Sequence, residues 1–186
     1  VIADNINCYY NVAKEEINLS SLNINLEEIE KINIIACGTS YYAGLTAKYW
    51  FEKIARIPVE IDIASEFRYR DVVFSKNGIC LFISQSGETA DTIAALREAK
   101  KFGQKILSIV NVAESTIANE SDSVLITNAG PEIGVASTKA FTTQLITLAF
   151  LVLQTALKRK VITKQESAKY VSHLMEIPGR VQDILN

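Results

Sequence analysis

The sequence gathers residue types suited to binding small anions in three short segments. These segments are Cys37-Gly38-Thr39-Ser40, Ser84-Gln85-Ser86-Gly87-Glu88-Thr89, and residues 129–139, which contain Gly134, Val135, Ala136, Ser137 and Thr138. Each offers Ser or Thr hydroxyls as neutral donors and a glycine that lets the backbone approach a ligand closely. Each also precedes a helical pattern, and a helix begins with free backbone N–H groups at the positive end of its dipole. The chemistry indicated is the binding of a phosphate or a similar anion.

The middle segment is the richest of the three. Ser84, Ser86 and Thr89 can point their hydroxyls at one centre, and Gln85 can reach a sugar hydroxyl. Helix capping is the alternative explanation for any single segment, because Ser, Thr and Gly are common just before helices. Three such segments at one edge of a sheet favour a ligand site, since ligands of open parallel sheets bind at that edge.

The residues that the segments lack narrow the ligand further. Neither GxGxxG nor GxxxxGK[ST] is present, so neither a dinucleotide nor an ATP-type site is indicated. Lys139 is the one cation near the segments, which suits a single phosphate monoester on a small polar molecule. With one histidine and three widely spaced cysteines, we expect no metal and no cofactor.

The elements that must position these segments follow from the hydrophobic pattern. Five apolar, β-branched runs predict strands buried on both faces: residues 32–36, 59–63, 79–83, 106–110 and 124–127. Helical patterns predict helices over residues 41–56, 89–102, 139–160 and 165–185. Gly103 stands where a C-cap glycine belongs. We therefore predict a three-layer α/β sandwich with an open, parallel, five-stranded sheet, helices on both faces and long C-terminal helices.

The first 31 residues read as a lead-in that packs on a single domain spanning residues 32–186. Lys14 and Lys31 stand there against Asp4, Glu15, Glu16, Glu27, Glu28 and Glu30, a balance of 2 − 6 = −4. A short acidic helix is predicted around residues 26–30.

The composition and charge limit the kinds of partner that we expect this protein to have. The net charge of −2 gives no footprint of nucleic-acid binding. No signal peptide pattern opens the chain, and the apolar stretch 145–153 is shorter than a membrane span, so we expect a cytoplasmic protein with no membrane partner. The helix after Thr138 is apolar on nearly all sides. We expect the sheet to cover one of its faces and a second subunit the other, which predicts a homodimer.

Several other residues could be read as functional, but a structural role accounts for each. We expect His173 to be a surface or packing residue, Cys37 a small buried residue and Cys80 part of the core. Glu88 could be a general base, but its place in the first helical turn favours a capping or dipole role. Glu66, Arg68 and Arg70 could form ion pairs after the second strand or a charged interface, and both interpretations stay open.

At the three segments the sequence resembles the SIS (sugar isomerase) domain family, which has a flavodoxin-like fold. The resemblance is strongest to the first SIS half of the isomerase domain of glutamine–fructose-6-phosphate aminotransferases, also called glucosamine-6-phosphate synthases. Four segments carry it: residues 36–40 (ACGTS), 63–70 (IASEFRYR), 84–92 (SQSGETADT) and 132–142 (EIGVASTKAFT). The SQSGET segment is typical of SIS domains in general, whereas the second and fourth together are more specific to these synthases.

The resemblance implies a binding site for fructose 6-phosphate or glucosamine 6-phosphate. Ser84, Gln85, Ser86 and Thr89 would hold the phosphate, while Thr39, Ser40, Val135 and Ser137 would contact the rest of the sugar or close the pocket. Enzymes of this family use ammonia from glutamine to convert fructose 6-phosphate into glucosamine 6-phosphate, without a cofactor or metal.

The sequence also departs from the family pattern. The chain begins with Val1 and Cys8 is internal, so the family's N-terminal glutaminase cysteine has no counterpart. The family's acid–base residues, Schiff-base lysine and second SIS half lie beyond Asn186. We therefore expect a fragment that binds the substrate, contains no catalytic residue and is inactive by itself.

Two other functions remain as alternatives. A regulatory sugar-phosphate sensor is one, because SIS domains also occur fused to DNA-binding modules; the acidic first 31 residues and the synthase-specific segments weigh against it. A stand-alone phosphosugar isomerase is the other. The lack of a plausible acid–base pair counts against it, since moving a proton between carbons needs a positioned base.

Overall fold

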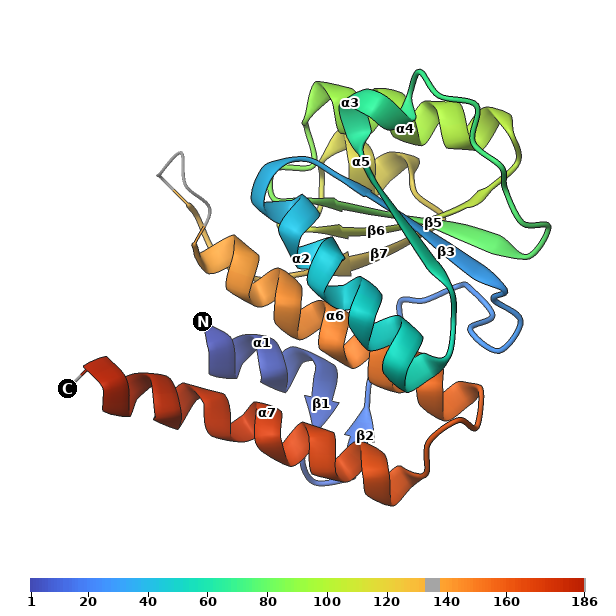
Figure 1. Cartoon of the computed structure of the whole chain (residues 1–186). Coiled ribbons are helices and arrows are strands. Elements are labelled where there is room, and N and C mark those ends of the chain that lie inside the picture. Colours follow the sequence, from blue (N-terminus) through green and yellow to red (C-terminus); the bar gives the residue numbers. More distant parts are fainter. Residues whose placement is uncertain (133–137, 186) are drawn as a thin grey trace.

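The five apolar runs form one parallel sheet, as predicted. The computed structural model describes residues 1–132 and 138–185 (Figure 1). The strands are β3 (Lys31–Ala36), β4 (Val59–Ile63), β5 (Gly78–Ser84), β6 (Lys105–Val110) and β7 (Ser123–Ile126). They pair in the order β4-β3-β5-β6-β7, and every pairing is parallel. β5 is buried along its whole length, which explains why it shows no polar alternation.

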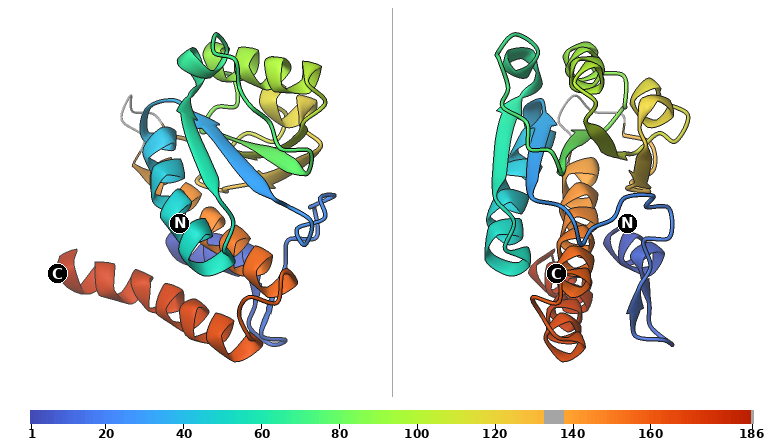
Figure 2. Two further views of the ribbon diagram at one scale, coloured as in Figure 1. Left: turned by 45° about the vertical axis from the view of Figure 1, so that its right-hand side comes forward. Right: turned by 90° about the vertical axis from the view of Figure 1, so that its right-hand side faces the viewer.

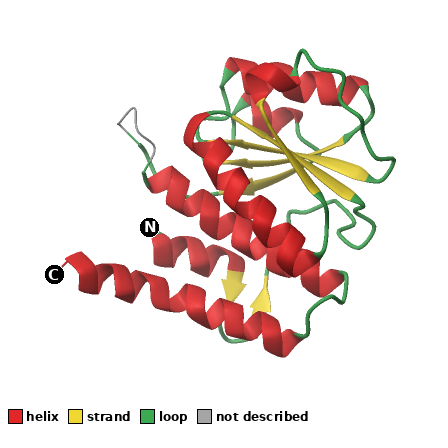
Figure 3. Cartoon of the chain, viewed as in Figure 1, coloured by secondary structure: helices red, strands yellow, loops and turns green. Residues whose placement is uncertain are grey.

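Helices cover both faces of this sheet, which confirms the predicted three-layer α/β sandwich (Figure 3). The helices are α1 (Ile2–Tyr9), α2 (Gly38–Trp50), α3 (Ala64–Phe67), α4 (Ala90–Lys101), α5 (Thr116–Glu120), α6 (Lys139–Lys158) and α7 (Lys164–Leu185). α2 continues into a π-helical turn, η1 (Phe51–Ala55), and ends at Arg56 in the left-handed conformation. The helix predicted over residues 41–56 therefore begins three residues earlier, at Gly38.

The sheet separates two hydrophobic clusters. On one face, Ile34, Leu81 and Leu107 belong to the cluster that α2 and α6 cover. On the other, Phe82 and Ile35 belong to the cluster beneath α3, α4 and α5. Figure 2 shows the sheet between these two groups of helices, with α1 and α7 beyond α6.

The N-terminal segment contributes to the first of these clusters. It contains α1 and a two-stranded hairpin of β1 (Tyr10–Asn11) and β2 (Glu16–Ile17). Six of its apolar side chains are buried in that cluster: Ile6, Tyr9, Leu19, Ile24, Leu26 and Ile29. The Tyr9 hydroxyl donates to the carbonyl of Ile126, 2.5 Å away at the end of β7. The division of the chain at residue 31 stays a prediction.

The prediction of an acidic helix over residues 26–30 is wrong. This stretch is irregular and leads directly into β3. Its apolar side chains, Leu26 and Ile29, point into the core. The Asn25 carboxamide accepts from the Glu27 backbone N–H at 3.2 Å, a local turn that competes with a helix.

α6 is the buried helix that its apolar composition predicts. Among the described residues it is the one helix long and apolar enough to cross a membrane, and 67% of its most apolar window is buried inside the protein. α1, α2 and α7 pack against it (Figure 1). The apolar character of α6 is therefore explained largely by its burial against other elements of the same chain.

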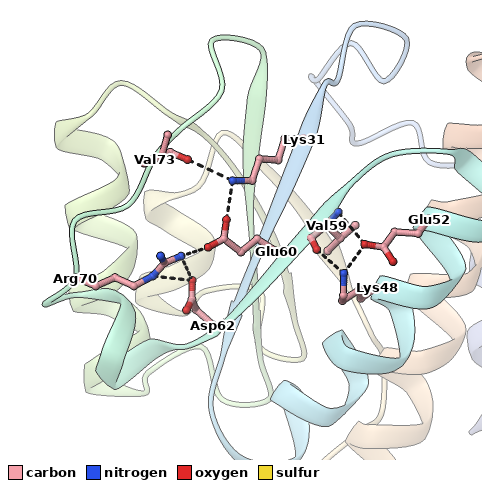
Figure 4. Close-up of polar contacts among 8 residues, drawn as sticks. All are labelled: Lys31, Lys48, Glu52, Val59, Glu60, Asp62, Arg70 and Val73. Atoms are coloured by element: carbon pink, nitrogen blue, oxygen red, sulfur yellow. Dashed lines mark hydrogen bonds and ion pairs between the residues drawn. The ribbon is translucent and has the colours of Figure 1, made fainter.

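A network of charges covers the edge strand β4 (Figure 4). Arg70 forms ion pairs with Glu60 and with Asp62, the latter at 2.7 Å between Nη2 and Oδ2. Lys31 pairs with Glu60 at 2.6 Å and donates to the Val73 carbonyl at 3.3 Å. These ion pairs confirm one of the two interpretations of Arg70. Charged side chains along an edge strand also oppose its pairing with another sheet.

The beginning of β4 is held by a second ion pair, also drawn in Figure 4. Lys48 and Glu52 pair within one turn of helix. The Lys48 ammonium donates to the Val59 carbonyl at 2.7 Å, and the Glu52 carboxylate accepts from the Val59 N–H at 3.3 Å. The first residue of the edge strand is thus tied to the helix that precedes it.

Candidate functional site

The strand order places two of the predicted segments at the point where ligands of open sheets bind. The chain runs from β3 outward to β4 and then returns to the other side of β3 with β5. This change of direction between β3 and β5 is a topological switch point, and the crevice beyond the carboxyl ends of such strands is the usual binding site. Ala36 and Ile83 are register partners at that end, so the loops after β3 and β5 leave the sheet side by side.

The loop after β5 is organised around Ser84, which is buried at the last position of the strand. The Gly87 N–H donates to the Ser84 hydroxyl oxygen at 3.0 Å. Thr89 Oγ1 lies 3.4 Å from the same oxygen. Gln85, Ser86 and Thr89 are half-buried. The structure therefore brings the residues predicted in this loop around one short turn before α4.

The serine hydroxyls of the two loops have a common donor–acceptor pattern. In each case a protein N–H donates to the hydroxyl oxygen: Gly87 N to Ser84, the Glu88 N–H to Ser86 at 3.1 Å, and the Gln144 side chain to Ser40 at 2.9 Å. A hydroxyl whose oxygen already accepts keeps its own proton to donate elsewhere. Phosphate oxygens are acceptors, so this is the sense of polarity that a phosphate requires.

The loop after β5 is fixed to α5 through Gly87 and Glu88. Gly87 has a φ of +67°, and a Cβ there would lie 2.0 Å from Ser115 Oγ, so only glycine fits. The Glu88 carboxylate accepts from the N–H and the hydroxyl of Thr116, at 2.6 and 2.8 Å. These two hydrogen bonds lower the pKa of Glu88, which makes it a weaker base, and they engage its carboxylate as an acceptor from Thr116. Glu88 thus has the predicted capping role, but it caps α5 and not the helix that follows it.

The loop after β3 places its two predicted residues differently. Thr39 is exposed in the first turn of α2, whereas Ser40 is buried. Gly38 begins this helix with a φ of +56°. Thr92 Oγ1, on α4, lies 3.9 Å from the Cys37 thiol, a contact that joins the β3 loop to the helix after the β5 loop. Cys37 is half-buried, close to the small buried residue expected.

The third segment is described only in part. Val135 and Ser137, both predicted site residues, lie outside the described residues, as do Gly134 and Ala136. The N-terminus of α6 is filled by the chain itself: the Glu132 carboxylate accepts from the N–H groups of Thr138, Lys139 and Ala140, at 2.7 to 3.2 Å. Among the described residues Glu132 therefore occupies this helix N-terminus, while the predicted roles of Val135 and Ser137 stay predictions.

The N-termini of α2 and α4 differ from that of α6 in this respect. Neither of their N-cap side chains forms a capping hydrogen bond, and no described side chain accepts from the first-turn N–H groups that follow. Both helices begin beside the switch point. The pair of open N-termini, together with the hydroxyls of Ser40, Ser84 and Ser86, forms the candidate anion site.

Two positioning residues of this site were missed by sequence reasoning. Asn111, at the end of β6, donates its N–H to the Gln85 carbonyl and its side-chain amide to the Gly130 carbonyl, at 3.1 and 3.0 Å. It thereby links the β5 loop to the loop after β7. Gln144 holds Ser40 from α6. A polar residue directly after a predicted strand was a usable signal for Asn111, whereas nothing local marks Gln144.

The remaining candidates have structural roles. Arg68 pairs with Asp91 on α4 at 3.0 Å, which confirms the ion-pair interpretation. His173 is exposed on α7, and Cys80 is fully buried in the sheet, both as expected. Burial raises the pKa of the Cys80 thiol to about 12, so this cysteine is not a nucleophile at neutral pH.

A cavity of about 900 Å³ lies away from the candidate site, between the β1–β2 hairpin and the junction of α6 and α7. Its lining includes Lys14, Lys158 and Lys164 but no residue of the three predicted segments. The N-terminus of α7 beside it is closed by a reciprocal pair of hydrogen bonds between Thr163 and Glu166. The hydroxyl-lined switch point remains the better candidate site.

The fold and this site define the class of protein. Residues 25–154 match the model of the SIS domain family, and the chain belongs to that family. The C-terminal domain of glucosamine-fructose-6-phosphate aminotransferase from Francisella tularensis superposes with a TM-score of 0.88 at 46% identity, over 95% of this chain and 50% of that one.

Curated relatives point to the same enzyme. The chain is 50% identical over its whole length to 30% of the isomerizing glutamine–fructose-6-phosphate aminotransferase of Zymomonas mobilis. It is 51% identical over its whole length to 31% of the enzyme of the same name from Bradyrhizobium diazoefficiens. The chain therefore spans about a third of the length of these relatives and corresponds to part of their isomerase region.

Proposed function

We propose that the chain binds fructose 6-phosphate or glucosamine 6-phosphate between the loops after β3 and β5. In this proposal it is the phosphosugar-binding half of the isomerase domain of an isomerizing glutamine–fructose-6-phosphate aminotransferase. The observation that carries the proposal is the polarity of Ser40, Ser84 and Ser86. Each hydroxyl oxygen accepts from a protein N–H and can donate its own proton to a ligand; for Ser84, Thr89 Oγ1 at 3.4 Å is the alternative acceptor.

We assign each site residue a role from its position in the loops. Ser84, Ser86 and Thr89 donate to the phosphate together with the N–H groups at the start of α4. Gln85, at the lip of the loop, reaches a sugar hydroxyl. Thr39 and Ser40 approach from the start of α2, and Val135 and Ser137 are assigned from the sequence alone.

The chemical step belongs to the longer relatives. These relatives are isomerizing glutamine–fructose-6-phosphate aminotransferases. The proposal assigns no catalytic residue, metal or cofactor to this chain, and Glu88, the carboxylate in the loop, is engaged as the cap of α5. We infer that this segment grips the substrate, that the transforming groups lie elsewhere in the longer enzyme, and that this chain alone is inactive.

Isothermal titration calorimetry tests the binding proposal. Fructose 6-phosphate should bind to the 186-residue chain, and Ser86→Ala should weaken it about tenfold, since a hydrogen bond to a charged group is lost. Ser172→Ala, an exposed serine on α7, is the matched control and should bind like the wild type. Unphosphorylated fructose should not bind. Equal affinity of the Ser86→Ala variant and the wild type would exclude this loop as the phosphate site.

Location and self-association complete the proposal. We propose a cytoplasmic protein without a nucleic-acid or membrane partner, on the basis of its composition and charge. We also propose a homodimer, although its expected basis has changed because helices of the same chain cover most of α6. We place its interface on α2, where two aromatic side chains seven residues apart, Tyr42 and Tyr49, are 61% and 62% exposed on one face.

A further inference from the structure

Gln144 is a buried polar residue whose position is unexplained by packing. It lies on α6 with only 1% of its surface exposed. Its Nε2 donates to Ser40 Oγ at 2.9 Å, but its Oε1 has no partner among the described residues. A buried amide oxygen without a hydrogen bond is costly, and an apolar side chain of the same length would avoid that cost.

The single hydrogen bond that Gln144 does form has a consequence for Ser40. A serine hydroxyl carries one proton. Since its oxygen accepts from Gln144, this proton is free to be donated, and no described residue accepts it. Ser40 lies in the first turn of α2, whose N-terminus is open. The hydroxyl is thereby held as a donor at an anion-binding helix end.

Without Gln144, the Ser40 hydroxyl has another partner. A serine in the first turn of a helix can donate to the carbonyl three residues earlier, which here is that of the N-cap residue Cys37. That hydrogen bond would turn the proton away from the site. The amide of Gln144 opposes this rotation because it requires the oxygen lone pair to face α6.

We propose that Gln144 is a positioning residue that fixes the Ser40 hydroxyl as a hydrogen-bond donor to the bound sugar phosphate. It acts through Ser40 and does not touch the ligand. This inference rests on the proposed function and adds a link between α6, which begins directly after the third segment, and the loop after β3. The unsatisfied Oε1 is the stability cost of this arrangement.

The proposal predicts opposite effects of one substitution on stability and on affinity. Gln144→Met, similar in length and apolar, should leave the thermal midpoint unchanged or raise it, because a buried unsatisfied oxygen is removed. The same variant should bind fructose 6-phosphate about three- to tenfold more weakly, measured by calorimetry. A residue with a purely structural role would lower stability and leave the affinity of the folded protein unchanged.

A double-mutant cycle then tests whether the effect passes through Ser40. Ser40→Ala should weaken binding about tenfold. In that background Gln144→Met should cause no further loss, since the hydroxyl it orients is absent. Equal losses in both backgrounds, or no loss in either, would overturn the proposal.

The cycle has a second variant and an internal control. Gln144→Asn keeps the amide but is one methylene shorter, so it withdraws Nε2 from Ser40 and should behave like Gln144→Met. The outcomes also separate this inference from the proposed function. If the wild type fails to bind fructose 6-phosphate, the proposed function fails; if it binds and Gln144→Met binds equally well, only the role of Gln144 fails.

Discussion

At the scale of single residues, the direction of hydrogen bonds carries more information than the number of polar side chains. Ser84 and Ser86 are aligned by backbone N–H groups of their own loop, whereas Ser40 depends on a side chain 104 positions away in the sequence. Glu88 illustrates the converse. Its two hydrogen bonds with Thr116 lower its pKa and make it a cap for α5, although a carboxylate beside a phosphate loop resembles a catalytic base.

The ion pairs of Glu60 make a residue-scale prediction about acid stability. The hydrogen bond from Lys31, and then those from Arg70, lower the pKa of Glu60 in the folded state. A lowered folded pKa contributes stability above the unfolded pKa, and this stability is lost as pH falls through the folded value. Glu60→Gln should therefore lower the free energy of unfolding at pH 7 by about 1 kcal/mol or less, given its partial exposure, and by progressively less as the pH falls below the unfolded pKa of a glutamate.

Urea denaturation of the wild type and Glu60→Gln at a series of pH values measures this difference. Glu28→Gln is the matched control, because Glu28 is exposed and takes part in no ion pair among the described residues. A constant difference between wild type and Glu60→Gln from pH 7 to pH 3 would contradict the assigned role.

At the scale of elements, the candidate site is built from junctions between a strand and a helix. The loop after β5 is fixed on three sides, by Gly87 against Ser115, by Glu88 on the N-terminus of α5, and by the Asn111 N–H on the Gln85 carbonyl. A loop held in this way loses little further entropy when a ligand binds. α5, which the sequence did not suggest, is thus a support for the site.

Gly87 gives the element-scale prediction. Its φ of +67° resembles that of Gly103, at +69°, but a Cβ on Gly103 would meet nothing within 4 Å. Gly103→Ala should therefore cost only the strain of a left-handed alanine, about 1–2 kcal/mol. Gly87→Ala should cost about 1–3 kcal/mol more, because its Cβ would overlap Ser115.

Thermal and urea unfolding of the two glycine variants compare strain alone with strain plus overlap. A third variant, Gly87→Ala/Ser115→Gly, should recover most of the stability difference between Gly87→Ala and Gly103→Ala. Equal destabilisation at Gly87 and Gly103 would mean that Ser115 moves freely aside and that the loop is not fixed against α5.

At the scale of the whole molecule, the sheet separates two unequal groups of helices. One face carries α2, α6 and, beyond them, α1 and α7, whereas the other carries α3, α4 and α5 (Figure 1). The apolar surface of α6 is largely covered by other elements of the same chain. The argument for a dimer therefore moves from α6 to the exposed aromatic side chains of α2.

Sedimentation velocity tests this whole-molecule prediction. The wild-type chain should sediment as a dimer at concentrations of tens of micromolar, and Tyr42→Ser/Tyr49→Ser should shift it towards the monomer, since apolar area is removed from the interface. Tyr69→Ser is the control, because Tyr69 lies after α3 and is more exposed, at 79%. A wild type that is monomeric at all concentrations would overturn the dimer, and a dimer insensitive to the α2 variants would place the interface elsewhere.

The sequence alone determined the α/β class, all five sheet strands and the two loops of the candidate site. Each of these depends on local patterns: buried β-branched runs, and Ser, Thr and Gly before a helix. The same local signals failed at residues 26–30, where a run of acidic residues favours a helix but Leu26 and Ile29 are drawn into the core of an irregular segment.

Only the tertiary structure decided how the site is supported. Glu88 caps α5 and Gln144 orients Ser40, and each of these contacts joins segments that local patterns treat separately. A long-range hydrogen bond depends on strand order and helix packing, which bring together side chains far apart in the chain. The residue types that bind a phosphate can therefore be read from the sequence, whereas the partners that orient them follow from the fold.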